Sequence, residues 1–194
     1  VIVVNWNGRE HLPGCLGSLS SLAYPNARVI LVDNGSTDGS ADYARARHPR
    51  VALIENRRNE GFAAGNNRGM ARALEEGARY VALLNNDMEV EPGWLDALVE
   101  AAEGDPSVGA CAPKLLYFGR REIVQGIGVR LNRIGLAWDY LNGRYDTPEL
   151  AVEPLEAARG QPLRAEQHQG DSVAALQQPE TDRAQQVAAV AGRR

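Results

Sequence analysis

The chain has 194 residues, which is enough for one well-packed domain and short for two. Its formal charge of −4, spread over mixed acidic and basic residues, excludes a strongly basic face for nucleic acid or anionic lipid and favours a small ligand. Two cysteines, Cys15 and Cys111, exclude a disulfide framework and favour a reducing compartment, in which both would be small buried apolar residues.

No apolar run reaches the roughly 18–20 residues that cross a bilayer, and no signal segment opens the chain. The sequence instead begins at Val1, inside a strand-like run and without a methionine. We therefore expect a cytoplasmic protein, peripheral at most to the inner face of a membrane, and a sequence that is a fragment.

Four short apolar runs recur between polar segments, at residues 1–4, 29–32, 51–54 and 81–84. None alternates with polar residues, which is typical of strands buried on both faces of a parallel sheet. The segments between these runs have the apolar spacing and the composition of helices, at residues 11–22, 40–47 and 63–76. A further segment of this kind follows the fourth run, at residues 92–103. This alternation predicts a three-layer α/β domain with a mostly parallel central sheet and right-handed crossovers.

The pattern changes after residue 108. Residues 108–118 and 123–132 read as strands joined by a turn around 119–122, followed by a loop over 135–146. Beyond that point there is no aromatic residue, and seven of the eight glutamines lie between Gln161 and Gln186. We expect a domain over residues 1–145 and a divergent tail over 146–194, disordered or weakly helical from 157, with a short helix over 184–191.

Polar side chains follow each of the four apolar runs: Asn5 and Asn7; Asp33, Asn34 and Ser36; Glu55 and Asn56; and Asn85, Asn86 and Asp87. The carboxyl ends of parallel strands form the edge at which open α/β sheets bind ligands. Any one of these loops could instead use its Asn, Asp and Gly residues to shape a turn. Four such loops together favour a ligand-binding surface at this edge of the sheet.

Several familiar sites are excluded by the residues themselves. No dinucleotide-binding GxGxxG, no GxxxxGK[ST] phosphate loop and no GxSxG nucleophile motif is present. The three histidines, His11, His48 and His168, lack the spacing of a zinc site and are expected at the surface.

Four segments, "VIVVNWNGREHLPGCLGSL", "VILVDNGSTDGS", "NEGFAAGNNRGM" and "YVALLNNDMEVEPGWLDALV", resemble family 2 glycosyltransferases in order and spacing, over residues 1–99. The likeness is to the branch of bacterial rhamnosyltransferase-like enzymes. It implies a Rossmann-like GT-A nucleotide-diphospho-sugar transferase fold. It also implies inverting transfer of a hexosyl or deoxyhexosyl group from a UDP-, dTDP- or GDP-sugar to a saccharide or lipid-linked acceptor in cell-surface polysaccharide synthesis.

The resemblance assigns the nucleotide to residues from three loops. Asp33 would contact the base or ribose together with Asn34 and Ser36, and the backbone around Asn5 and Asn7 would border the base. The structural alternatives are a turn cap for Asp33 and loop-shaping hydrogen bonds for the two asparagines. Gly65, with Gly61, would let the main chain approach the donor, Asn66 would bond to it, and Arg68 would face the diphosphate or be solvated.

"NND" stands where the family carries its DxD motif. The resemblance implies that Asp87 binds Mg²⁺ or Mn²⁺, that Asn85 hydrogen-bonds ribose or phosphate, and that Asn86 belongs to the same donor site. A cap for the following turn is the alternative for Asp87, and Glu89 is expected to be a solvated acid.

The family supplies its general base, an Asp or Glu, from a later Glu-Asp pair with aromatic neighbours, and this chain loses that pattern after residue 150. Asp139, Asp146 and Glu149 lie in the region without the expected neighbours, so the base is unassigned. Two alternatives stay open: a non-catalytic nucleotide-sugar-binding remnant, and an unrelated doubly wound domain whose asparagine-rich loops only shape turns.

Overall fold

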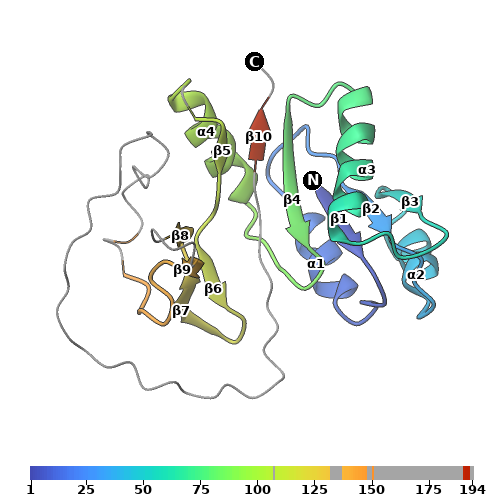
Figure 1. Ribbon diagram of the computed structural model, residues 1–194, viewed down its shortest axis with the longest axis horizontal. Helices are drawn as coiled ribbons and strands as arrows, with labels where there is room; N and C mark the ends of the chain where they lie inside the picture. Colours follow the sequence, from blue (N-terminus) through green and yellow to red (C-terminus); the bar gives the residue numbers. More distant parts are fainter. Residues whose placement is uncertain (107, 132–136, 148–149, 151–189, 193–194) are drawn as a thin grey trace.

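The computed structural model describes residues 1–106, 108–131, 137–147, 150 and 190–192. Four parallel strands form one side of a six-stranded sheet whose order is β3-β2-β1-β4-β10-β5 (Figure 1). They are β1 (Ile2–Asn5), β2 (Ile30–Asp33), β3 (Ala52–Glu55) and β4 (Tyr80–Asn85). The chain moves outward from β1 to β2 and β3 and then crosses back to β4, so a topological switch point lies between β1 and β4.

The remaining two strands of this sheet are short. β5 (Ala110–Cys111) lies at the edge, and β10 (Val190–Gly192) runs antiparallel between β4 and β5. The short helix expected over 184–191 is therefore wrong at residues 190 and 191, because their backbone groups pair with two strand edges. The other residues of the expected tail from 151 onward, apart from 192, lie outside the described part of the chain.

Four helices accompany the sheet: α1 (Leu12–Leu19), α2 (Ser40–Arg47), α3 (Phe62–Glu75) and α4 (Trp94–Gly104). They lie where the sequence predicts helices, but α1 ends three residues early. The hydroxyls of Ser20 and Ser21 donate to the carbonyls of Leu16 and Gly17, at 2.7 and 3.4 Å. Side-chain bonds of this kind compete with continuation of a helix, which explains the early end.

Successive strand residues point to opposite faces, and both faces of the sheet are covered. On one face Val3, Leu31 and Leu84 pack with Leu12 and Leu16 of α1, and Ala44 of α2 joins the same cluster. On the other face Ile2, Ile30 and Val32 pack against α3. α4 adds Leu95 and Leu98 against Ala82 of β4. This three-layer burial explains why the strand sequences are apolar without interruption.

Two glycines on one side of α3 allow that helix to approach β1 closely. A Cβ atom at Gly65 would lie 2.8 Å from Val4 Cγ1, and one at Gly69 would overlap Ile2 Cγ2. Larger residues at these positions would force the helix away from the sheet.

The chain after β5 forms small antiparallel pairs: β6 (Leu115–Tyr117) with β7 (Arg120–Gly126), and β8 (Val129–Leu131) with β9 (Ala137–Asp139). Four predictions need correction here. The strand expected over 108–118 is interrupted around Pro113, which has no N–H to donate, and the one over 123–132 is interrupted before β8, where Gly128 has φ +121°. The loop expected over 135–146 contains β9, and the turn after β6 is Phe118–Gly119, so β7 begins at Arg120.

The segment after β9 is tied back to this antiparallel unit. Lys114 Nζ lies 2.7 Å from Asp146 Oδ1, and Val124 donates its N–H to the carbonyl of Arg144 at 2.8 Å. The described part of the chain contains no helix with the length and hydrophobicity that crossing a bilayer requires.

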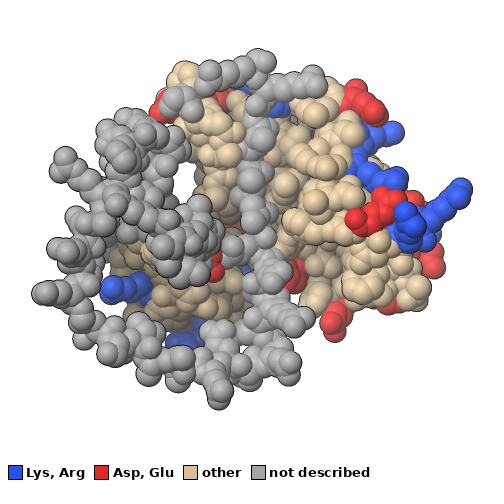
Figure 2. All heavy atoms as spheres, viewed as in Figure 1, with Lys and Arg blue, Asp and Glu red and all other residues tan. Residues whose placement is uncertain are grey.

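Basic and acidic side chains are interspersed on the face seen in Figure 2. Ion pairs such as Arg45–Glu55, at 2.6 Å, and Arg79–Glu103, at 2.8 Å, mix the two signs of charge in the same way. This face therefore carries no single basic patch.

Gly69→Ala should destabilise the protein by about 1–3 kcal/mol, because its methyl group overlaps Ile2 and the close packing of α3 on β1 is lost. Gly17→Ala is the matched control, since no atom lies within 4 Å of a Cβ built there, and alanine should stabilise α1 by about 0.5–1 kcal/mol. Urea denaturation of both variants measures the difference. Equal changes in the free energy of unfolding would contradict the packing argument.

Candidate functional site

The register of the sheet brings the polar strand ends together. Asn5 is paired with Asp33, and Asp33 with Glu55, so the last residues of β1, β2 and β3 form one row. Val4 is paired with Asn85, which sets Asn86 level with Asn5. All four parallel strands thus extend one residue beyond their apolar runs and end at a polar residue: Asn5, Asp33, Glu55 or Asn85.

The Asn5 side chain joins three of these strand ends. It is fully buried, at 0% exposure. Its amide nitrogen donates to Asp33 Oδ1 and to Ser36 Oγ, both at 3.2 Å, and its amide oxygen accepts from Asn86 Nδ2 at 2.7 Å. Asn5 therefore connects the loop after β2 with the loop after β4, and the loop-shaping alternative describes its side chain.

Asp33 is also turned inward. It is 3% exposed, and its second carboxylate oxygen accepts from the backbone N–H of Ser36 at 2.9 Å. These are the contacts of a turn cap, the structural alternative for this residue. Asn7 differs, because it lies exposed at the rim with φ +50°, donates its N–H to Ser36 Oγ at 2.9 Å and accepts from the N–H of Thr37 at 2.8 Å.

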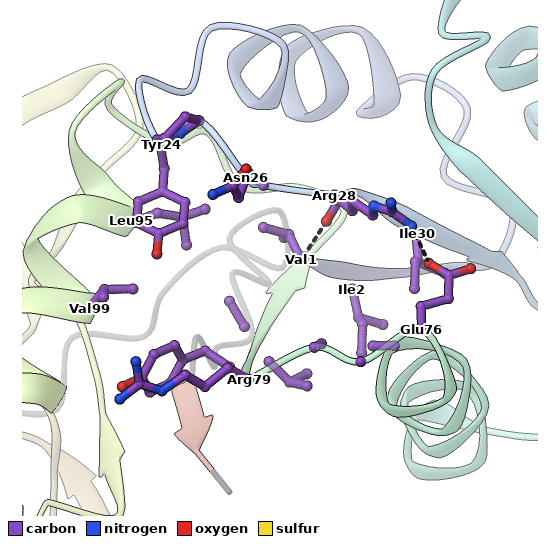
Figure 3. Close-up of a pocket in the computed structure, with 18 residues that line it drawn as sticks. Val1, Ile2, Tyr24, Asn26, Arg28, Ile30, Glu76, Arg79, Leu95 and Val99 are labelled. Carbon is purple, nitrogen blue, oxygen red and sulfur yellow. Dashed lines mark hydrogen bonds and ion pairs between the residues drawn. The ribbon is translucent and has the colours of Figure 1, made fainter.

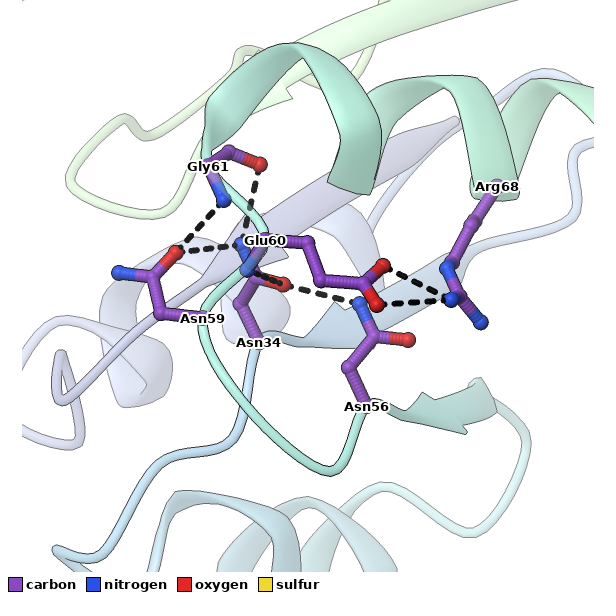
Figure 4. A network of polar contacts seen from close by, with 6 residues as sticks. All are labelled: Asn34, Asn56, Asn59, Glu60, Gly61 and Arg68. Carbon is purple, nitrogen blue, oxygen red and sulfur yellow. Dashed lines mark hydrogen bonds and ion pairs between the residues drawn. The ribbon is translucent and has the colours of Figure 1, made fainter.

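Asn34 anchors the segment that leads into α3 (Figure 4). Its amide nitrogen donates to Asn59 Oδ1 at 3.0 Å and to the carbonyl of Gly61 at 3.1 Å. Its oxygen accepts from Asn56 Nδ2 at 2.9 Å and from the N–H of Glu60 at 3.2 Å. Asn34 thus positions this segment through its own side chain, and Asn59 is a partner that the sequence motifs did not single out.

The three predicted residues on α3 have internal partners as well. Arg68 pairs with Glu60 at 2.8 Å, with half of its side chain exposed. Asn66 is buried and donates to the carbonyl of Phe62 at 3.0 Å. Gly65 is buried against Val4, so the close main-chain approach that it permits is an approach to β1.

Two oxygens after β4 have no such partners. Asn85 Oδ1 and Asp87 Oδ1 are buried and form no hydrogen bond within the described part of the chain. Burial also raises the pKa of the Asp87 carboxyl, an effect that a hydrogen bond from its own backbone N–H and the nearby His11 partly oppose. Buried oxygens without partners are costly, and two together at a strand end suit a hard cation or a hydroxyl donor.

The described residues contain no group of three or more His, Cys, Asp or Glu side chains placed to hold a metal. A cation at Asp87 would therefore complete its coordination with a ligand and water. Mg²⁺ is commonly bound in this way, by one or two carboxylates and substrate phosphates.

A cleft of about 820 Å³ opens beside Asn85 and Asp87. Its opposite wall comes from the β6–β7 hairpin and carries Lys114, Tyr117 and Arg121. Arg121 spans the two walls through Glu91 at 2.9 Å and Glu89 at 3.6 Å. Glu89 is thus an ion-paired cleft residue as well as an exposed acid. Asn5 and Asp33 do not line this cleft.

A second cavity, of about 570 Å³, lies at the other end of the sheet (Figure 3). It is bordered by Val1, Arg28, Glu76 and Arg79; Val1 donates its amino group to the carbonyl of Arg28 at 2.6 Å, and Arg28 pairs with Glu76 at 3.2 Å. None of the predicted site residues lines it, so the candidate site is at the carboxyl ends of the strands.

The remaining described candidate groups do not line the cleft beside Asn85 and Asp87. Asp146 is bound by Lys114, neither Asp146 nor Asp139 lines the cleft, and Glu149 lies outside the described residues. Cys15 and Cys111 are free; Cys15 is buried, and Cys111 is partly exposed. Burial, with the charges of Asp87 and Glu89, raises the pKa of Cys15 to about 12, so its thiol is not a nucleophile at neutral pH.

His11 is exposed and His48 half-buried, while His168 lies outside the described residues. The surface position expected for the histidines is therefore confirmed for His11.

The arrangement can be compared with known proteins. The family model described as glycosyl transferase family 2 matches residues 1–147. The chain belongs to glycosyl transferase family 2. This membership excludes the unrelated doubly wound domain considered from the sequence.

Curated relatives include an N-acetylglucosaminyl-diphospho-decaprenol L-rhamnosyltransferase of Mycobacterium tuberculosis, 35% identical over 121 residues that cover 58% of this chain and 39% of that protein. A cholesterol galactosyltransferase of Borreliella burgdorferi is 28% identical over 61% of this chain and 33% of its own length. The match thus spans well under half the length of these relatives.

Among solved structures, the mannosyltransferase PcManGT from Pyrobaculum calidifontis, in complex with GDP-Man and Mn²⁺, is 27% identical with a TM-score of 0.50 over 59% of this chain and 34% of that one. Staphylococcus aureus TarS 1–349 in complex with UDP-GlcNAc gives a TM-score of 0.51 at 16% identity, over 65% of this chain and 42% of that one. The family 2 chain therefore has the three-layer GT-A fold that the sequence predicts.

Replacing Asn5 by alanine should destabilise the protein by about 2–4 kcal/mol, because Asp33 and Asn86 would each lose a buried partner. Asn67→Ala, at an exposed position of α3, should change stability by less than about 0.5 kcal/mol. Chemical denaturation of the two variants makes the comparison. A cost for Asn5→Ala as small as that for Asn67→Ala would show that the side chain does not hold the strand ends together.

Proposed function

We propose that this chain is the donor-binding half of an inverting, metal-dependent glycosyltransferase that takes its sugar from a nucleotide diphosphate. The observation that carries the proposal is the pair of buried, unpartnered oxygens, Asn85 Oδ1 and Asp87 Oδ1, beside the cleft at the end of β4. Family membership and the α/β fold support it.

Electrostatics favour a cation beside Asp87, although Lys114, Arg120 and Arg121 balance the acids of the cleft as a whole. A nucleotide diphosphate is an anion, and Asp87, Glu89 and Glu91 place three acids along one wall. Arg121 offsets part of that charge through Glu89 and Glu91, but within the described part of the chain Asp87 forms no ion pair. A divalent cation held by Asp87 removes the repulsion between carboxylate and phosphate.

Asp87 would hold Mg²⁺ or Mn²⁺, and Asn85 Oδ1 would accept from a ribose hydroxyl or complete the cation site. When bound, such a cation would stabilise the negative charge that builds up on the departing nucleotide. Mn²⁺ in the mannosyltransferase complex supports the choice of metal.

The nucleotide would lie along the neighbouring strand ends. Asn7 offers an exposed rim for the base, which Ser36 holds directly and Asp33 holds through Ser36. Asn86 supports the same edge through Asn5, and Asn34 positions the segment that leads into α3. Gly65 and Asn66 would support the donor from the start of α3, and Arg68 would reach the diphosphate by exchanging its ion pair with Glu60 for one with phosphate.

Inversion would require a base that removes the acceptor hydroxyl proton while the oxygen attacks the anomeric carbon. We assign no described residue to this role. The placement of Asp139 and Asp146 away from the cleft favours a second candidate function, a remnant that binds donor without transfer.

The acceptor would be a saccharide or lipid-linked saccharide, and the cellular process cell-surface polysaccharide synthesis, at the cytoplasmic face of the membrane. The mycobacterial relative, named for transfer to a diphospho-decaprenol-linked sugar, supports this choice. The donor would be a UDP-, dTDP- or GDP-sugar.

Asp87→Ala should abolish the metal-dependent part of nucleotide affinity while leaving the thermal midpoint nearly unchanged, because a partly exposed loop carboxylate adds little to packing. Calorimetric titration of UDP, dTDP and GDP, with and without Mn²⁺, measures the effect. Asp96→Ala, an exposed acid in the first turn of α4, should bind like the parent. If Asp87→Ala keeps its metal-dependent nucleotide affinity, the assignment of the cation to Asp87 is wrong.

Donor turnover separates the enzyme from the remnant. With Mn²⁺ present, the enzyme should release nucleoside diphosphate from a UDP-, dTDP- or GDP-sugar, and more rapidly with an acceptor, whereas the remnant should bind the donor and release none. Chromatographic measurement of the released nucleoside diphosphate decides between the two functions, with Asp87→Ala as the negative control. Metal-dependent binding without any release in the full panel would favour the remnant.

A further inference from the structure

The side chain of Asp87 belongs to a short segment between β4 and α4, residues 85–90, whose position is set partly by α1. Gly14 and Cys15 of α1 each lie one turn before Ser18, at four and three residues from it. Each of them contacts this segment at a different place. These contacts lie outside the hydrogen-bond network of Asn5.

Ser18 makes the contact at the far end of the segment. Its hydroxyl accepts from the N–H of Val90 at 3.2 Å and donates to the carbonyl of Cys15 at 2.9 Å. The Ser18 hydroxyl therefore donates one hydrogen bond and accepts another, which fixes its orientation. Without the Ser18 hydroxyl, the N–H of the half-buried residue Val90 would lose this hydrogen-bond partner.

Cys15 and Gly14 make the other contacts. The Cys15 thiol donates to the carbonyl of Asn85 at 3.7 Å, and that carbonyl also accepts from the N–H of Met88 at 3.3 Å. At Gly14 the missing side chain leaves room for the Glu89 carboxylate, which a Cβ atom would overlap. Met88 and Val90 pack on the core cluster that contains Leu12 and Leu16 of α1.

Asp87 lies between these fixed points. We propose that Ser18 is a positioning residue for the cation: through Val90, and together with Cys15 at Asn85, it holds residues 85–90 in the shape that presents Asp87 Oδ1 to a divalent metal. The inference depends on the proposed function, because it assumes that Asp87 binds a cation. A carboxylate held in place before binding loses less conformational entropy when the metal arrives.

The experiment measures Mn²⁺ affinity rather than turnover. Mn²⁺ is titrated into the full chain with UDP, dTDP or GDP in separate series, and free Mn²⁺ is followed by electron paramagnetic resonance. Ser18→Ala should raise the Mn²⁺ dissociation constant roughly three- to tenfold. Nucleotide affinity in EDTA should stay at the parental value, and Ser18→Thr, which keeps the hydroxyl, should restore most of the lost Mn²⁺ affinity.

Ser20→Ala is the matched control, because the Ser20 hydroxyl donates to Leu16 of its own helix and its loss should leave Mn²⁺ affinity unchanged. Parental Mn²⁺ affinity in Ser18→Ala, or an equal loss in Ser20→Ala, would overturn the inference. If Ser18→Ala does not fold, Cys15→Ala removes the bond to Asn85 instead, and unchanged affinity in that variant overturns it. A parent that binds no Mn²⁺ with any nucleotide would overturn the proposed function and this inference together.

Discussion

The amide of Asn5 is the interaction on which the candidate site depends. Parallel strands deliver their ends to one edge of a sheet, but the loops that follow diverge unless something joins them. Asn5 donates to the loop after β2 and accepts from the loop after β4, across the switch point between β1 and β4. An amide can do this because it carries a donor and an acceptor on one short side chain.

The polar residues at this edge of the sheet fall into two groups. The residues nearest the sheet, Asn5, Asp33 and Asn34, form hydrogen bonds with one another's loops and are nearly inaccessible. Asn85, Asp87 and Asn56 each keep a buried oxygen without a partner in the described part of the chain, and of these Asn85 and Asp87 lie beside the cleft. The motif residues of the family are thus of two kinds in this chain: those that build the edge and those that have oxygens left for a ligand.

Much of the fold could be predicted because its signals are local. Each parallel strand consists of an apolar run with one polar residue at its end, and α2 has the predicted bounds. β10 could not be predicted in this way, because Val190 pairs with Ala82, more than a hundred positions away, and the strand forms by pairing with both β4 and β5. β9 was missed because Ala137–Asp139 is short and adjoins turn-forming residues. The clustering at the strand ends was predicted from spacing, whereas the inward orientation of Asp33 depends on the loop geometry that brings Ser36 to it.

The edge of the sheet is built largely from neutral groups. Asn5, Asn34, Asn56, Asn59 and Asn86 bond to one another or to nearby backbone, and their amides neither gain nor lose a proton in ordinary buffers. Acidification therefore leaves these particular bonds electrostatically unchanged, while it does alter carboxylates such as Asp87. In a titration of binding against acidity, the amide–amide bonds of this edge would contribute a constant background, and the changes would come from the ligands and from carboxylates such as Asp87.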